Sequence, residues 1–349
     1  MEKNAPMTMK DIAQALGVSV ATVSRALNDN PNISKERREA IQQFAREHNY
    51  MPNVIAEQLR HSRSQPTRMI GVIIPQILHF YFASVLSGIE QAAAARDYRI
   101  VVAQSDEQYA REVEICKSFI LNKVCGIIVS QAKDTVNYDH FIELEKNGVP
   151  LVFYDRICPA INASRVVIDD YMGTLKAVDY LIKTGCKRVA FYGTSPNMEI
   201  GKNRYNGYKD ALYQNGLKLD ESIVKMCDTA EEALRVTPPL LGRKDRPDAI
   251  FAVNDETAVA ALSVAKKMGF AIPDELSICG FTNSNISRVT DPQLSSVEQQ
   301  GFTVGEQAAE ILIGLVEGTI PSDHATKRVI KTHLIARGTT RHLKEDITK

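Results

Sequence analysis

The spacing of hydrophobic residues divides the chain into two parts. Before residue 50, aliphatic residues recur every three or four positions, which is the spacing of one face of an α-helix. From residue 69 onward, short aliphatic runs such as IGVII and AIFAV alternate with longer amphipathic stretches. This alternation is typical of parallel β-sheets flanked by helices. The pattern therefore predicts a small helical module followed by a larger α/β domain of two parallel-sheet subdomains.

The first part contains a pattern typical of a helix-turn-helix. Residues 9–27 predict two short helices, with Thr8 and Ser19 as N-caps and Gly17 in the turn. A third helix is expected at residues 35–49, after Ser34, which we predict to be its cap. Its predicted inward-facing residues are Ile41, Phe44 and Ala45. Together the three helices predict a headpiece of about 50 residues, which is near the lower size limit for independent folding.

The second predicted helix has an outward face suited to DNA. A helix in the major groove needs short residues near its N-terminus and a hydrogen-bond donor further along. Arg25 is such a donor, because a bidentate pair with guanine discriminates strongly between bases. Val20 is either a base contact or a core residue, since it shares a face with Val23. The rest of this outward face consists of Ala21, Thr22, Ser24 and Asn28.

The stretch MKDIAQALGVSVATVSRALN, with the run at residues 54–59 after NYMPN, resembles the lactose-repressor (LacI/GalR) family of bacterial transcription regulators. The resemblance extends over nearly the whole chain. It implies that Val20, Ala21 and Arg25 meet base edges. Contacts to phosphate set register without reading sequence, and they are expected from the three hydroxyl residues Ser19, Thr22 and Ser24.

Residues 53–60 predict a further short helix after Pro52, too brief to be stable alone in water. By resemblance it is a hinge helix that orders when two copies pair over DNA. Leu59 then matches an apolar wedge inserted into the minor groove, and Arg60 could reach phosphate or a groove edge. The alternative is that Leu59 packs within its own short helix.

The larger part also resembles the periplasmic sugar-binding fold, in which the chain crosses between two subdomains three times. We therefore expect a headpiece at 1–62, a linker at 63–68 and an effector-binding and dimerisation domain at 69–349. The first subdomain is expected to comprise residues of about 69–165 and 300–326, and the second about 166–298 and 327–345.

Ligands of such sheets bind at the carboxyl ends of strands and between domains. That rule, together with the resemblance, predicts effector contacts from Tyr81, Phe82, Asp155, Arg156, Arg204, Asn254, Asp255, Thr282 and Gln299. Aromatic rings beside polar groups favour a sugar-like or nucleoside-like ligand. Many family members carry an acidic residue where this chain has Thr282, and its absence favours an anionic or phosphorylated effector instead.

Three of these residues have structural alternatives. Phe82 is equally suited to the core of its helix. Asp155 and Arg156 could form an ion pair that closes the subdomains. Asp255 is placed to cap the helix that follows it, which we favour over a ligand contact.

The composition does not indicate a function, but it restricts the classes of protein to which the chain can belong. The 349 residues carry no formal net charge, and ten Lys/Arg against seven Asp/Glu give residues 1–68 a mild excess of +3. Six scattered cysteines without a C-x-x-C pair predict reduced, mostly buried thiols rather than zinc ligands or disulfides. Neither a membrane-spanning run nor a signal-peptide pattern is visible. We expect a cytoplasmic bacterial protein that is associated with the nucleoid when bound.

The sequence thus predicts a transcription regulator, most simply a repressor. It would bind a palindromic operator as a homodimer and respond to a small-molecule effector, with a sugar or sugar derivative favoured. An α/β enzyme is the first alternative, but the chain has no G-x-G-x-x-G after an early strand and no G-x-x-x-x-G-K-[ST]. We therefore expect no enzyme, no cofactor and no metal. A cytosolic solute-binding protein without a regulatory role is the other alternative.

Overall fold

The computed structural model describes residues 7–50 and 67–343. The predicted hinge helix at 53–60, with Leu59 and Arg60, lies outside the described residues. The chain forms two compact units, Met1–Thr67 and Arg68–Lys349.

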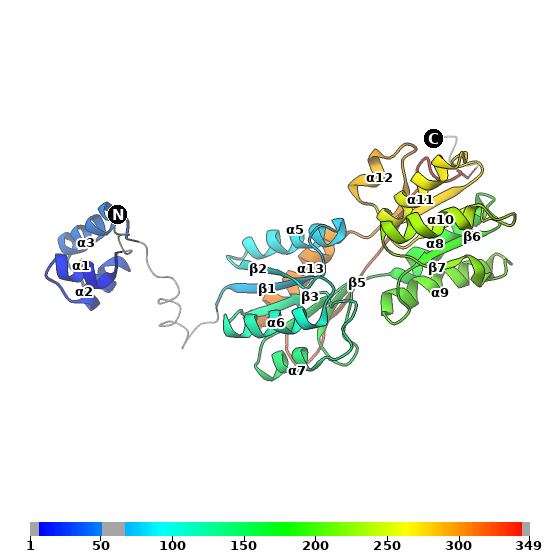
Figure 1. Ribbon diagram of the computed structural model, residues 1–349. Helices are drawn as coiled ribbons and strands as arrows, with labels where there is room; N and C mark the ends of the chain where they lie inside the picture. Colours follow the sequence, from blue (N-terminus) through cyan, green and yellow to red (C-terminus); the bar gives the residue numbers. More distant parts are fainter. Residues whose placement is uncertain (1–6, 51–66, 344–349) are drawn as a thin grey trace. The chain divides into compact units, whose positions relative to one another are not determined.

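The first unit contains the three predicted helices, α1 (Met9–Ala15), α2 (Val20–Leu27) and α3 (Lys35–Glu47) (Figure 1). They pack around a core that includes Ile12, Val23 and Ile41, all at most 1% exposed. Both predicted caps are confirmed for α1 and α2. Thr8 forms a capping box with Asp11, and the Ser19 side chain accepts a hydrogen bond from the backbone of Thr22.

The third helix differs in detail from its prediction. It ends at Glu47 rather than at residue 49, and Ser34 occupies the N-cap position without a side-chain hydrogen bond. Ile41 and Ala45 are buried as predicted. Phe44 is only half-buried, and its ring stacks on that of the exposed His48, with 4.0 Å between ring centroids.

The second unit contains two six-stranded sheets, and the first is entirely parallel. Its strands, in spatial order, are β11 (Lys327–Ile330), β5 (Ser164–Ile168), β4 (Leu151–Tyr154), β3 (Gly126–Val129), β1 (Met69–Ile74) and β2 (Arg99–Gln104). One face is covered by α5 (Phe80–Ala94) and α13 (Gly301–Glu317), and the other by α6 (Tyr109–Leu121) and α7 (Asp139–Lys146). This parallel, two-sided burial explains why the strands are continuous aliphatic runs in the sequence.

The second sheet has the same build with one antiparallel edge. Its strands are β12 (His333–Ile335), β10 (Ser295–Glu298), β9 (Ser277–Thr282), β8 (Ala249–Ala252), β6 (Val189–Gly193) and β7 (Val224–Met226). The edge strand β12 runs antiparallel to β10. The associated helices are α8 (Asp170–Lys183), α9 (Glu199–Gln214), η1 (Glu221–Ile223), α10 (Ala230–Leu241), α11 (Asp255–Lys267) and α12 (Asn285–Val289).

Two strands belong to a different sheet from the one that the sequence analysis assigned. The division at residue 166 placed most of β5 in the second subdomain, and residues 327–330 were placed there as well. Both assignments are wrong, because β5 pairs with β4 and with β11 in the first sheet. The alternation of strands and helices gives their order along the chain, but not which strand each one pairs with. The chain passes between the sheets after β5, between β10 and α13, and between β11 and β12.

All six cysteines are buried, and none forms a disulfide, as predicted. Among the described helices, none is both long and apolar enough to cross a membrane.

Glycines allow α5 and α13 to cross at close range. A Cβ atom added at Gly305 would lie 1.9 Å from the carbonyl oxygen of Val85, and one added at Gly88 would lie 2.0 Å from that of Phe302. Backbone atoms cannot retreat as a side chain can, so Gly305→Ala is expected to lower the free energy of unfolding by about 3 kcal/mol. Chemical denaturation of the full chain measures this loss.

Gly314 supplies the matched control in the same helix. A Cβ atom there meets only the side chains of Ile320 and Thr319. Gly314→Ala should therefore be far milder, because alanine favours the helix and these side chains can rotate away. Equal denaturation midpoints for the two variants would contradict the close backbone crossing.

Candidate DNA-binding and effector sites

The outward face of α2 is exposed as a DNA-reading helix requires. Val20 is 42% exposed, whereas Val23 on the neighbouring turn is fully buried. The alternative that Val20 belongs to the core is therefore wrong. Arg25 is exposed, and its side chain makes no hydrogen bond or ion pair with any described residue. Its guanidinium is thus available to a partner outside the chain.

The other predicted DNA residues surround Arg25 on the same helix. Ala21 and Asn28 are exposed, while Thr22 and Ser24 are half-buried. The Ser19 hydroxyl lies 2.8 Å from that of Thr22, and the Asn28 amide donates to the carbonyl of Ser24 at 3.0 Å. Ser19 therefore has a structural role as a helix cap in addition to any phosphate contact.

In the second unit, the carboxyl ends of both sheets meet around a cavity of about 360 Å³, which we call the cleft. Eight of the nine predicted effector residues line it, namely Tyr81, Phe82, Asp155, Arg156, Arg204, Asn254, Thr282 and Gln299. The rule that ligands bind at the carboxyl ends of parallel strands accounts for this gathering.

Arg204 is held by three contacts within the second sheet's half of the cleft. Its Nε donates to Asp170 at 2.7 Å, and its Nη1 donates to the carbonyl of Val253 at 2.6 Å. The guanidinium carbon also lies 4.1 Å from the ring centroid of Phe281. Burial raises the pKa of Asp170 to about 6, although the charge of Arg204 acts in the opposite direction. These contacts fix the Arg204 side chain before any ligand binds.

Asp155 and Arg156 form a long ion pair, but both residues follow β4 of the first sheet, so the prediction that this pair closes the subdomains is wrong. Their charged atoms are 3.9 Å apart, whereas Arg156 Nη1 lies 2.5 Å from Glu107 Oε2. Arg156 also lies over the ring of Phe82, 5.5 Å from its centroid. Burial raises the pKa of Asp155, while Arg156 opposes the shift. Glu107, which the sequence analysis missed, is thus the main partner of Arg156.

Asp255 is neither the helix cap nor a cleft residue. Asn254 caps α11, because its Oδ1 accepts a hydrogen bond from the backbone of Thr257 at 2.8 Å. The Asp255 carboxylate instead accepts from the backbone and hydroxyl of Ser284, at 2.6 and 2.8 Å, and from the hydroxyl of Ser296. The N-cap is the residue just before the first residue of a helix. The sequence pattern predicted that α11 begins after Asp255, whereas the helix begins at Asp255 itself.

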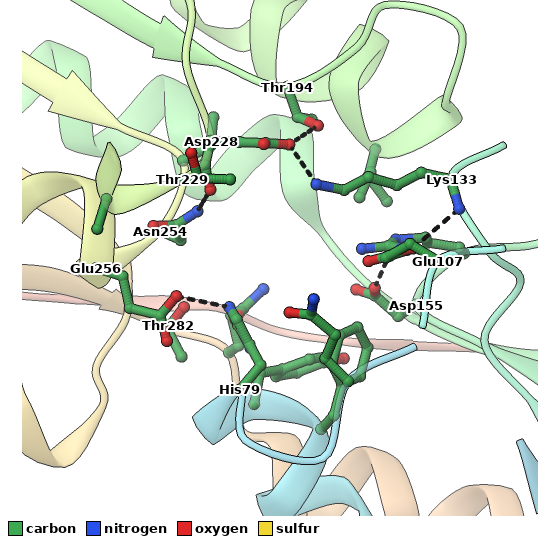
Figure 2. A pocket seen from close by; sticks show the side chains of 18 of the residues that line it. His79, Glu107, Lys133, Asp155, Thr194, Asp228, Thr229, Asn254, Glu256 and Thr282 are labelled. Carbon is green, nitrogen blue, oxygen red and sulfur yellow. Dashed lines mark hydrogen bonds and ion pairs between the residues drawn. The ribbon is translucent and has the colours of Figure 1, made fainter. Parts of the chain in front are cut away.

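The cleft also contains charged residues that the sequence analysis did not select. Lys133 follows β3 and reaches Asp228, which follows β7, with 2.9 Å between Nζ and Oδ2 (Figure 2). His79 Nε2 lies 3.9 Å from Glu256 Oε2 on the start of α11. These charged residues could have been predicted by the same rule, because they too follow strands. For Asp228 the signal is weak, since β7 is short and only weakly apolar in the sequence.

Comparison with known proteins identifies both units. Residues 8–53 match the model for bacterial regulatory proteins of the lacI family, and residues 178–340 match that for a periplasmic binding protein-like domain. The chain is 31% identical over 337 residues to the HTH-type transcriptional repressor CytR of Escherichia coli K12, covering 96% of this chain and 97% of that protein. This chain belongs to the lacI family of bacterial regulatory proteins.

Further relatives and solved structures resemble this chain over almost its full length. The ribose operon repressor of Bacillus subtilis is 30% identical over 97% of this chain and 99% of its own. The transcriptional regulator CelR, in complex with cellobiose, superposes with a TM-score of 0.72 at 25% identity, over 95% of this chain and 99% of that one. The lac repressor dimer bound to operator superposes at 0.82, but at 22% identity it supports the fold alone. The predicted fold class is confirmed.

The charges in this lacI-family cleft are largely balanced by their own partners. Each lining cation is paired with a carboxylate, as Lys133 with Asp228, Arg156 with Glu107 and Arg204 with Asp170. Five carboxylates line the cleft against these three cations, namely Glu107, Asp155, Asp228, Glu231 and Glu256. Carboxylates therefore outnumber cations among the residues that line the cleft.

Three buried polar atoms of cleft-lining residues make no hydrogen bond with a described residue. They are the Tyr81 hydroxyl, His79 Nδ1 and Arg156 Nε. Burial raises the pKa of Tyr81, so its hydroxyl keeps its proton and can donate. Unpaired buried polar groups are costly, and a ligand with hydroxyl groups would satisfy them.

The imidazole of His79 is expected to titrate far below its ordinary range. Burial, assisted by the charge of Arg156, lowers its pKa from 6.5 to about 4. The folded chain thus resists protonating His79, and stability present above pH 6.5 is lost as the pH falls towards 4. By linkage the loss amounts to about 3 kcal/mol.

Denaturation at a series of pH values, comparing the natural chain with His79→Gln, measures this effect. Glutamine keeps a polar group of similar reach but does not titrate. The stability difference between the two proteins should move in favour of the variant as the pH falls. A difference that is constant from pH 7 to pH 4 would contradict the buried, neutral imidazole.

Proposed function

We propose that this protein is a transcription repressor that binds a palindromic operator as a homodimer and is controlled by a small, neutral, hydroxyl-rich effector in the cleft. The observation that carries the proposal is that one chain combines an exposed Arg25, without a partner among the described residues, on a helix-turn-helix with a cleft lined by aromatic and polar side chains. Relatives named as repressors, CytR and the ribose operon repressor, match almost the full chain. A two-fold protein implies an operator of the same symmetry.

For the DNA contacts, we propose that Val20, Ala21 and Arg25 meet base edges. Ser19, Thr22, Ser24 and Asn28 would hold the backbone of the half-site, since they border that surface. The N-terminus of α2 assists, because its free backbone N–H groups favour phosphate. Leu59 and Arg60 of the predicted hinge helix remain proposed minor-groove contacts, within a headpiece at 1–62 that a linker at 63–68 joins to the effector domain.

For the effector, a sugar is favoured and a nucleoside is the nearest alternative. Tyr81 and Phe82 offer apolar ring surface, while Asp155, Arg204 and Thr282 offer hydrogen-bonding groups. The relative CelR was solved with cellobiose, and a regulator from Enterococcus faecium with ribose. The self-paired cations of this cleft favour a neutral ligand of that kind over a sugar phosphate.

The proposal requires neither a cofactor nor a metal, and it includes no catalytic step. Within residues 7–50 and 67–343, no group of three His, Cys, Asp or Glu side chains is placed to hold a metal ion. A repressor acts where the chromosome lies, so we propose a cytoplasmic location.

Selection from a pool of random duplexes tests the proposal. Full-length protein at low salt should enrich an inverted repeat, because two headpieces read two half-sites. Failure to enrich any inverted repeat, with or without a panel of sugars and nucleosides, would overturn the regulatory proposal. Retained binding of a sugar in that case would favour a solute-binding protein instead.

A further inference from the structure

Lys133 and Asp228 join loops that belong to different sheets. Lys133 follows β3 of the first sheet and Asp228 follows β7 of the second, with 2.9 Å between Nζ and Oδ2. Within the part of the chain that the structure describes, no other pair of Lys or Arg with a carboxylate links the two sheets' loops. The bridge closes one wall of the cleft (Figure 2).

The loop that carries Lys133 is held by hydrogen bonds to the buried side chain of Glu112. The fully buried carboxylate of Glu112 accepts hydrogen bonds from the backbone of Ala132 and the hydroxyl of Thr135, both at 2.7 Å. His140 Nε2 lies 3.0 Å from the same carboxylate. The backbone N–H of Lys133 donates to Glu107 at 2.9 Å. These contacts hold the backbone on both sides of Lys133.

Asp228 is anchored on its own side of the cleft. Its backbone N–H donates to Glu232 at 3.0 Å, and its carbonyl accepts from the Asn254 amide at 2.7 Å. Its carboxylate also accepts from the Thr194 hydroxyl. Burial acts to raise the pKa of Asp228, but Lys133 and Thr194 outweigh it and lower that pKa. Asp228 thus presents a fixed negative charge to Lys133.

We propose that the Lys133–Asp228 bridge is a latch that holds the cleft closed and must open for the effector to enter or leave. Lys133 is 35% exposed and Asp228 is 17% exposed in their side chains, so water can reach the pair and compete with it. A partly exposed ion pair contributes little free energy, so it favours the closed form of the cleft but still allows the cleft to open. The latch regulates the effector site and therefore rests on the proposed function, but its opening can be measured without any effector.

Hydrogen exchange of the full chain, followed by mass spectrometry, tests the latch. Lys133→Met removes the charge and keeps the length of the side chain. It should speed exchange about fivefold at residues 226–232, on the opposite side of the cleft, as well as at residues 130–135. In an Asp228→Asn background, Lys133→Met should have no further effect at 226–232, because the pair is already broken.

Lys183→Met is the matched control, since Lys183 pairs with Asp179 at 2.7 Å within one helix. It should leave exchange in both cleft segments unchanged. Exchange that rises only in the segment carrying the substitution, or that rises further in the Asp228→Asn background, would overturn the latch. Operator selection is independent of this result, so failure of the repressor proposal and failure of the latch are distinguishable.

Discussion

Replacing Arg25 with alanine is expected to weaken binding to the selected operator by roughly 5- to 150-fold per half-site, while binding to unrelated DNA changes little. The range corresponds to about 1–3 kcal/mol for one bidentate contact between arginine and guanine. Arg25 is exposed and has no partner among the described residues, so its loss leaves nothing unsatisfied in the headpiece. Competition binding with operator and scrambled duplexes at one salt concentration measures both affinities.

Arg46→Ala is the control for the loss of charge. Arg46 is also exposed, but it lies in the last turn of α3 rather than on the outward face of α2. Its removal should weaken binding to operator and scrambled DNA alike, because non-specific attraction depends on charge. If Arg25→Ala behaved in the same way, Arg25 would contact phosphate and not bases.

Replacing Arg204 with alanine is expected to abolish the effector response while operator binding persists. Arg204 lines the cleft and is fixed by Asp170 and the carbonyl of Val253. The variant should also be less stable, by up to about 3–5 kcal/mol, since it leaves the buried Asp170 carboxylate without its partner. That cost is reduced wherever Asp170 is protonated, because its pKa is already raised to about 6.

A second variant separates lost contact from lost stability. Arg204→Met combined with Asp170→Asn removes both charges and leaves no uncompensated carboxylate. Stability should recover substantially, but the effector response should not. A normal dose–response in the double variant would place the effector elsewhere in the cleft.

The sequence predicted correctly those features that depend on residues close together in the chain. The caps Thr8 and Ser19 are set by the residues next to them, and the cleft residues follow from the strands that precede them. The sequence did not predict features that depend on contacts between residues far apart in the chain. Glu107 and Lys133 both follow strands, but their pairing with Arg156 and with Asp228, 95 positions from Lys133, is visible only in the folded chain. No periodicity encodes either contact.

The error at β5 has a similar origin. Its sequence is a strand in either sheet, and the choice depends on backbone pairing with β4 and β11, which lie far apart in the chain. Asp255 illustrates a smaller effect, in which shifting a helix boundary by one residue exchanges the roles of Asn254 and its neighbour. Both cases show that type and order of elements are more predictable than partners and ends.

Occupation of the cleft by an effector is expected to change how tightly the headpieces bind DNA. Thermal-shift screening of sugars and nucleosides supplies a ligand, and titration of the selected inverted repeat with and without that ligand at saturation is the direct measurement. We expect the dissociation constant for the inverted repeat to change by about 5- to 150-fold. An unchanged dissociation constant, with the ligand demonstrably bound in the cleft, would contradict this expectation.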